Sequence, residues 1–164
     1  MDIKEFGQNL DQKIEKEDNL SYAEQGIGLS PKDIEIKLMG QVSLLVDEEI
    51  SSKIELEMTK DFDAHIKANF KISRILDDLL KEKGMELDSL SGEIWMPTDT
   101  KWELCYEGDY VKIYKAGALD VLVSKAIKAP EKNRKLIQES LQIYGRVLSD
   151  KITQYGGDPN YFKK

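Results

Sequence analysis

Apolar residues recur along this chain with two periods, and each period predicts one kind of secondary structure. Spacings of three and four residues predict helices over 3–14, 72–80 and 119–127, and a long amphipathic helix over 136–152. The apolar run 42–46 predicts a further short, buried helix. Glycine and basic residues near the ends of these segments mark where the helices stop.

A period of two residues predicts strands. The alternation is clear in 34–38, 54–58 and 61–66, and three shorter runs follow at 94–96, 102–106 and 110–114. Gly108-Asp109 lies between the last two runs and predicts a hairpin turn. Gly26, Gly28 and residues 30–33 predict a loop before the first strand.

This order of elements predicts one α+β domain, a mixed β-sheet with flanking helices and a C-terminal helical pair. Residues 1–29 form an N-terminal helix and loop in this scheme. Residues 30–156 form the main body, including the C-terminal helices, and residues 157–164 form a loose tail.

Composition narrows the class of protein. The 164 residues are 40% hydrophobic, which is enough for a core, and no apolar run has the length of a membrane span. The start of the chain has no signal-peptide pattern, and a single cysteine, Cys105, excludes an internal disulfide, so we expect a cytoplasmic protein. A net charge of −7 argues against unspecific binding of duplex DNA, although residues 121–164 hold nine basic and four acidic side chains.

Asp61 and Asp63 are the sharpest chemical feature. On a strand, residues i and i+2 point the same way, so the two carboxylates lie on one face, with His65 beside them. Repulsion between neighbouring carboxylates raises their pKa values, and a divalent cation relieves it. A solvated polar face is the more common meaning of Asp-x-Asp, and a structural role is the more common meaning of a lone histidine.

Gly40 strengthens the metal interpretation. It follows a predicted strand and opens a predicted helix, where free N–H groups and a glycine backbone admit a phosphate. Ser43, one turn later, could add a hydroxyl group. The two segments together predict phosphates at the helix start and metal-binding carboxylates on a neighbouring strand.

The segments 36–45 and 59–63 resemble the DNA polymerase β-type nucleotidyltransferases, and most of all the small prokaryotic nucleotidyltransferase-like proteins, some of them antitoxin-like. The resemblance lies in an apolar strand, a glycine, a small residue, and then Thr-x-Asp-hydrophobic-Asp. It spans about residues 30–150, although few positions carry it.

The resemblance implies a nucleoside triphosphate bound with Mg²⁺, as one or two ions, and transfer of a nucleoside monophosphate to an RNA or protein acceptor. Asp61 and Asp63 would hold metal, and a third carboxylate, Asp99 or Glu103, would complete catalysis. The phosphates would lie on three residues of the glycine segment and two basic residues: Gly40, Gln41, Ser43, Lys125 and Arg134.

Departures from the family pattern support an alternative. Gln41 stands where relatives carry a second glycine or serine, Glu57 lies near a position that is basic in relatives, and the acid expected after Arg134 is absent. The alternative is a catalytically degenerate, antitoxin-like binding module that acts through a partner protein or as a homo-oligomer.

Other candidates have more ordinary explanations. Cys105 lies within a predicted strand, where it fits the role of a small buried hydrophobic side chain. Aromatic residues on the short strands could stack on a base, but cross-strand packing is their usual role. They are Trp95, Trp102, Tyr106, Tyr110 and Tyr114.

Overall fold

A four-stranded mixed sheet lies at the centre of the computed structural model, which describes residues 1–29, 31 and 33–163. Its order is β3 (Ala64–Lys67), β1 (Ile34–Leu38), β6 (Val111–Ala116) and β5 (Trp102–Glu107). β1 and β6 are parallel, and the other neighbouring pairs are antiparallel. A small parallel sheet joins β2 (Asp61–Phe62) to β4 (Glu86–Leu87). The fold class is α+β, as the sequence predicts.

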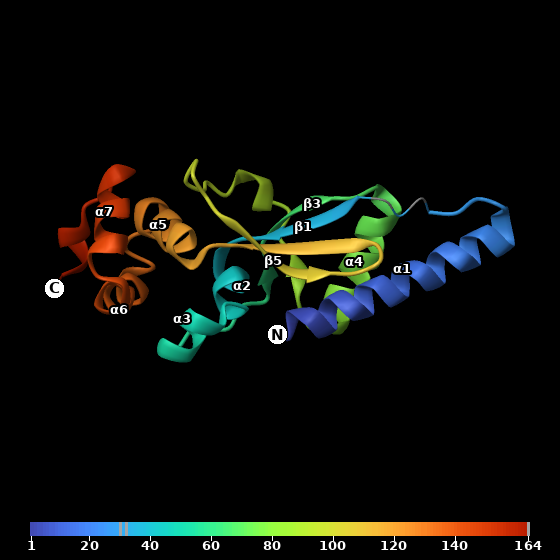
Figure 1. Ribbon diagram of the computed structural model, residues 1–164, viewed down its shortest axis with the longest axis horizontal. Coiled ribbons are helices and arrows are strands. Elements are labelled where there is room, and N and C mark those ends of the chain that lie inside the picture. The colour runs from blue at the N-terminus through green and yellow to red at the C-terminus, as the bar shows by residue number, and fades with distance from the viewer. Residues whose placement is uncertain (30, 32, 164) are drawn as a thin grey trace.

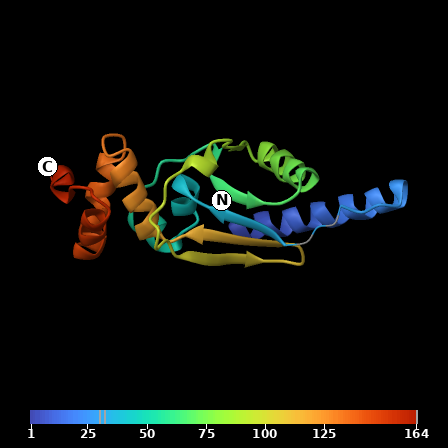
Figure 2. The ribbon, with the colours of Figure 1, turned by 90° about the horizontal axis from the view of Figure 1, so that it is seen from above.

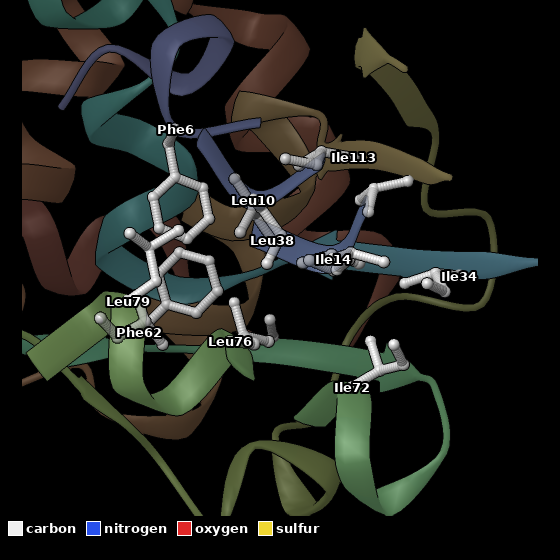
Figure 3. Packing of buried hydrophobic residues seen from close by; sticks show 14 of the residues in the cluster. Phe6, Leu10, Ile14, Ile34, Leu38, Phe62, Ile72, Leu76, Leu79 and Ile113 are labelled. Atoms are coloured by element: carbon white, nitrogen blue, oxygen red, sulfur yellow. The ribbon is translucent and has the colours of Figure 1, made fainter. Parts of the chain in front are cut away.

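Two helices cover one face of the four-stranded sheet. α1 (Ile3–Gln25) begins at Asp2, whose side chain accepts hydrogen bonds from two backbone N–H groups, and α4 (Phe70–Glu82) begins in the same way at Asn69. Figure 3 shows that side chains of both helices meet those of β1 and β6 in one buried cluster. α1 runs past the end of the sheet in both Figure 1 and Figure 2. The N-terminal helix is therefore part of the main core.

A second apolar cluster lies at the other end of the molecule, where α5, α6 and α7 gather (Figure 1). It joins these helices to α2 and α3. The bounds are α2 (Gly40–Leu45), α3 (Glu48–Lys53), α5 (Ala118–Lys128), α6 (Arg134–Tyr144) and α7 (Arg146–Gln154). Short 3₁₀ helices occupy Ser91–Glu93 and Pro159–Phe162. In the part of the chain that is described, no helix is long and apolar enough to cross a membrane.

Asp11 fixes α1 to the β5–β6 hairpin. Its buried carboxylate accepts hydrogen bonds from the Tyr106 hydroxyl and from the backbone N–H groups of Tyr110 and Val111, at 3.2 and 3.1 Å for the latter two. The predicted turn at Gly108 is confirmed by its N–H bond to the Val111 carbonyl oxygen at 2.9 Å. The hairpin is thus held by a side chain about 100 residues away in sequence.

Two predicted strands are wrong. Residues 54–58 have no strand partner, and Ile54 is the C-cap of α3 with its side chain in the second cluster. Residues 94–96 follow a 3₁₀ helix, and Trp95 and Met96 pack on that same cluster. In 54–58, Ile54 and Leu56 pack on the helices of the second cluster while Met58 is 79% exposed, and the apolar run 94–96 likewise packs on helices without a neighbouring strand.

The C-terminal predictions also need correction. The single helix predicted over 136–152 is two helices, α6 and α7, because Gly145 at φ 56° and ψ −130° interrupts the helical backbone. The predicted loose tail contains a 3₁₀ helix capped by Asp158, and Phe162 is only 2% exposed. Ser30 and Lys32 of the predicted loop, and Lys164 of the predicted tail, lie outside the described residues.

Candidate functional site

Asp63 lies where two strand pairings meet. The predicted strand 61–66 is divided, since β2 pairs with β4 while β3 pairs with β1. Asp63 falls between them, and its carbonyl oxygen accepts a hydrogen bond from the Met39 N–H at 2.8 Å. Phe62 and Ala64 are buried, so Asp61, Asp63 and His65 share the opposite face, as predicted.

Gly40 brings the start of α2 against the Asp63 carboxylate. Its φ of +58° is in the left-handed region that favours glycine, and a Cβ added there would lie 2.4 Å from Asp63 Oδ2. A side chain at this position would therefore displace the carboxylate. The close approach that the sequence predicts for a phosphate is made here by Asp63 itself.

Asp88 is a member of this site that sequence reasoning missed. The parallel register of Phe62 with Leu87 continues to place Asp63 beside Asp88, within hydrogen-bonding reach. Burial raises the Asp63 pKa to about 6, assisted by the hydrogen bond and charge of Asp88 and by the charge of Asp61. Asp63 Oδ1 is buried and has no hydrogen-bond partner among the described residues. No periodic signal could reveal Asp88, because β2 and β4 are two residues long.

Lys125 supplies the nearest positive charge. It lies half-buried on α5, and its charge opposes the rise in the Asp63 pKa. Burial and repulsion from Lys132 lower its own pKa, against the attraction of Asp63 and Glu57. The described part of the chain gives the Lys125 ammonium group no hydrogen bond or close ion pair. Of the two basic residues predicted to bind phosphate, Lys125 therefore acts on Asp63.

A small hollow of about 120 Å³ is lined in part by Gln41 and Glu57, and its lining does not include Asp63 or Lys125. The Gln41 side chain reaches into this region and donates a hydrogen bond to the Glu57 carbonyl oxygen at 2.8 Å. The remaining lining comes from α6, the α5–α6 connection and the segment after α3. It consists of Glu55, Leu56, Lys132, Asn133, Lys135, Leu136 and Glu139.

Two more of the predicted phosphate ligands, besides Gln41, have other partners. Ser43 is 1% exposed, and its hydroxyl donates to the Ala116 carbonyl oxygen at 3.0 Å. The Arg134 guanidinium lies 4.9 Å from the centre of the Tyr161 ring. Ser43 therefore joins α2 to the end of β6, and Arg134 holds the C-terminal 3₁₀ helix.

Neither predicted third carboxylate joins Asp63. Glu103 pairs with Lys115 at 2.5 Å on the helix-covered face of the sheet, three strand spacings (about 14 Å) from the position of Ala64. Asp99 instead accepts hydrogen bonds from Lys151 and Tyr155, and Lys151 belongs to α7.

A divalent cation fits only part of this arrangement. Asp63 and Asp88 provide two carboxylates, one with an unpartnered buried oxygen, and Mg²⁺ commonly combines one or two carboxylates with substrate phosphates. Across residues 1–29, 31 and 33–163, however, no three His, Cys, Asp or Glu side chains form a group that could hold a metal ion. The site therefore suits an ion that arrives with phosphate better than a resident ion.

Cys105 is half-buried at an irregularity of β5, and burial raises the pKa of its thiol. It forms no disulfide in the structure. It therefore has the character of a packing residue and is not an activated nucleophile.

No family model matches the chain, and no curated protein or solved structure shows significant similarity to it.

Proposed function

We propose that this protein binds a nucleoside triphosphate at Asp63 and Lys125 as a degenerate member of the nucleotidyltransferase-like proteins. The observation that carries the proposal is the half-buried Lys125 ammonium, whose charge acts on the half-buried Asp63 carboxylate next to the Gly40 backbone. An ammonium group without a close ion pair can bind a phosphate oxygen with little rearrangement of its side chain.

The geometry favours binding over nucleotidyl transfer. A transferase of this type needs a group that activates the attacking hydroxyl. Asp99 and Glu103 are engaged in ion pairs away from Asp63, and Ser43 is engaged by the Ala116 carbonyl oxygen. Transfer of a nucleoside monophosphate to an RNA or protein acceptor is the second candidate, and the neighbouring carboxylates Asp63 and Asp88 favour it.

In the binding function Asp63 and Asp88 would hold Mg²⁺ delivered with the phosphates. The ion would neutralise phosphate charge. Lys125 would bind a phosphate oxygen. A cysteine without a disulfide is consistent with action in the cytoplasm, where an antitoxin-like role would involve a partner protein.

Calorimetric titration with ATP, and with inorganic tripolyphosphate, each with and without Mg²⁺, tests the proposal. We expect binding by the wild-type protein and at least tenfold weaker binding by Lys125→Met, which removes one charge-assisted contact. Lys128→Met is the matched control, because Lys128 lies on the same helix over the Trp95 ring. Equal affinities for the two variants, or no binding of either ligand by the wild-type protein, would refute the proposal.

Release of pyrophosphate from ATP, in the presence of RNA or of a protein acceptor, separates the two candidates. The binding function predicts none. Turnover that disappears in Asp63→Asn would establish the transferase instead.

A further inference from the structure

One face of the four-stranded sheet is not covered by α1 and α4. Those helices pack on the side chains of Ile34, Ile36, Leu38, Val111 and Ile113, which all point to one side. The intervening residues point to the other side. The second cluster covers only the end of that side, where Ala116 is buried.

The register places one cross-strand row on the uncovered face directly beside the Asp63 site. His65 pairs with Lys37, Lys37 pairs with Tyr114, and Tyr114 pairs with Leu104. Leu104 is 51% exposed, His65 is exposed, and Lys37 and Tyr114 are half-buried. An aromatic ring therefore lies on this face between a lysine and an exposed leucine.

Lys37 makes this row suitable for a planar ligand. Its Nζ lies 5.3 Å from the centre of the Trp102 ring, so the ammonium already lies against an aromatic surface. No carboxylate of the described chain forms an ion pair with it.

The next row, farther from Asp63, has a different character. There Glu35 lies between Lys67 and Lys112, and Lys112 is 3.7 Å from Glu107. The charges in this row compensate one another, and the row contains no aromatic side chain. The row nearer Asp63 instead contains the aromatic ring of Tyr114 and the ammonium group of Lys37, which has no carboxylate partner among the described residues.

The row continues from the candidate site. Asp63 precedes His65 by two residues on the same face, and Tyr114 lies two strands farther on. The strand geometry then separates Asp63 and Tyr114 by about 12 Å between Cα atoms. An extended nucleoside triphosphate with its phosphates at Asp63 and Lys125 spans a comparable distance.

We propose that the base of the bound nucleotide lies on the uncovered sheet face, stacked on Tyr114 with its polar edge toward Lys37. This inference rests on the proposed nucleotide binding and identifies the residues that would determine base preference. A purine is the preferred base because its larger ring system covers more of the Tyr114 and Leu104 surface.

Comparison of ATP with inorganic tripolyphosphate tests the base contact separately from the phosphate contacts. We expect ATP to bind the wild-type protein at least tenfold more tightly than tripolyphosphate does, and CTP to lie between them. Tyr114→Thr should reduce ATP affinity about tenfold and leave tripolyphosphate affinity unchanged, whereas Tyr114→Phe should retain both.

Tryptophan emission gives a second measurement, because the chain has only Trp95 and Trp102. A base beside Trp102 should quench its emission, so ATP quenching should persist in Trp95→Phe and disappear in Trp102→Phe. Equal binding of ATP and tripolyphosphate, or no effect of Tyr114→Thr, would overturn the base contact while nucleotide binding stands. Failure of both ligands to bind would overturn both proposals.

Discussion

Replacement of Asp63 by asparagine should stabilise this protein, and only above acidic pH. Asparagine keeps the shape of the side chain and can donate a hydrogen bond to Asp88, but it carries no charge. The Asp63 pKa rises from 3.8 to about 6 in the fold, mainly through burial. The charged form is therefore disfavoured in the native state relative to the unfolded chain.

The sign of the pH dependence follows from proton binding. Between about pH 4 and pH 6 the native state holds a proton on Asp63 that the unfolded chain has lost, so stability falls as pH rises through this window. The full pKa difference of about two units would correspond to about 3 kcal/mol in the free energy of unfolding above pH 7, and solvent screening of the half-exposed carboxylate lowers this to about 1–3 kcal/mol. The Asp63→Asn variant lacks this dependence, because an amide side chain does not titrate.

Urea unfolding at intervals from pH 4 to pH 8 measures the difference between Asp63→Asn and the wild-type protein. We expect it to be close to zero at pH 4 and to reach about 1–3 kcal/mol by pH 7. Asp61→Asn is the matched control, since Asp61 is exposed and should change stability by less than about 0.5 kcal/mol. A difference that does not vary with pH, or a destabilised Asp63→Asn protein at pH 7, would refute the reasoning.

Three further substitutions test the fold at the site, at the β5–β6 hairpin and in the second cluster. Gly40→Ala should lower the free energy of unfolding by about 2–4 kcal/mol, because the new Cβ meets both a positive φ and Asp63 Oδ2; urea unfolding checks this, and a loss below about 1 kcal/mol would contradict it. Asp11→Ala should cost about 2–4 kcal/mol in the same assay by leaving two hairpin N–H groups and the Tyr106 hydroxyl without their acceptor. Unchanged stability there would mean that α1 does not depend on this contact. Phe162→Ala should cost about 3 kcal/mol by thermal unfolding, because the ring is buried in the second cluster. If Phe162→Ala has wild-type stability, the C-terminal tail is loose, as the sequence predicts, and does not pack on the second cluster.

The periodic segments were predictable because their signal is local. In α4, the residues Ile72, Leu76, Leu79 and Leu80 are buried on one side, so the spacing that predicts the helix is also the spacing that packs it. The same holds for β1, where buried and half-buried residues alternate. Residues 54–58 show the limit of this reasoning, since Ile54 and Leu56 pack against helices, Met58 is exposed, and the segment does not pair as a strand.

In the candidate site, too, some features follow from local sequence and others depend on contacts between distant segments. The shared face of Asp61 and Asp63 and the glycine conformation at Gly40 follow from short stretches of sequence. Asp88 and Lys125 enter through contacts between distant segments, as do the alternative partners of Ser43 and Glu103. Spacing along the chain carries no information on which of several carboxylates a given strand register brings to Asp63.

The sequence by itself determined the α+β class, most helix positions and the shared face of Asp61 and Asp63, because these depend on neighbours within a few residues. The tertiary structure alone decided which charges meet. Asp88 and Lys125 lie near Asp63, whereas Asp99 and Glu103 form ion pairs elsewhere. One face of the sheet is not covered by α1 and α4. Those outcomes depend on strand order, register and burial, which arise only when segments far apart in sequence pack together.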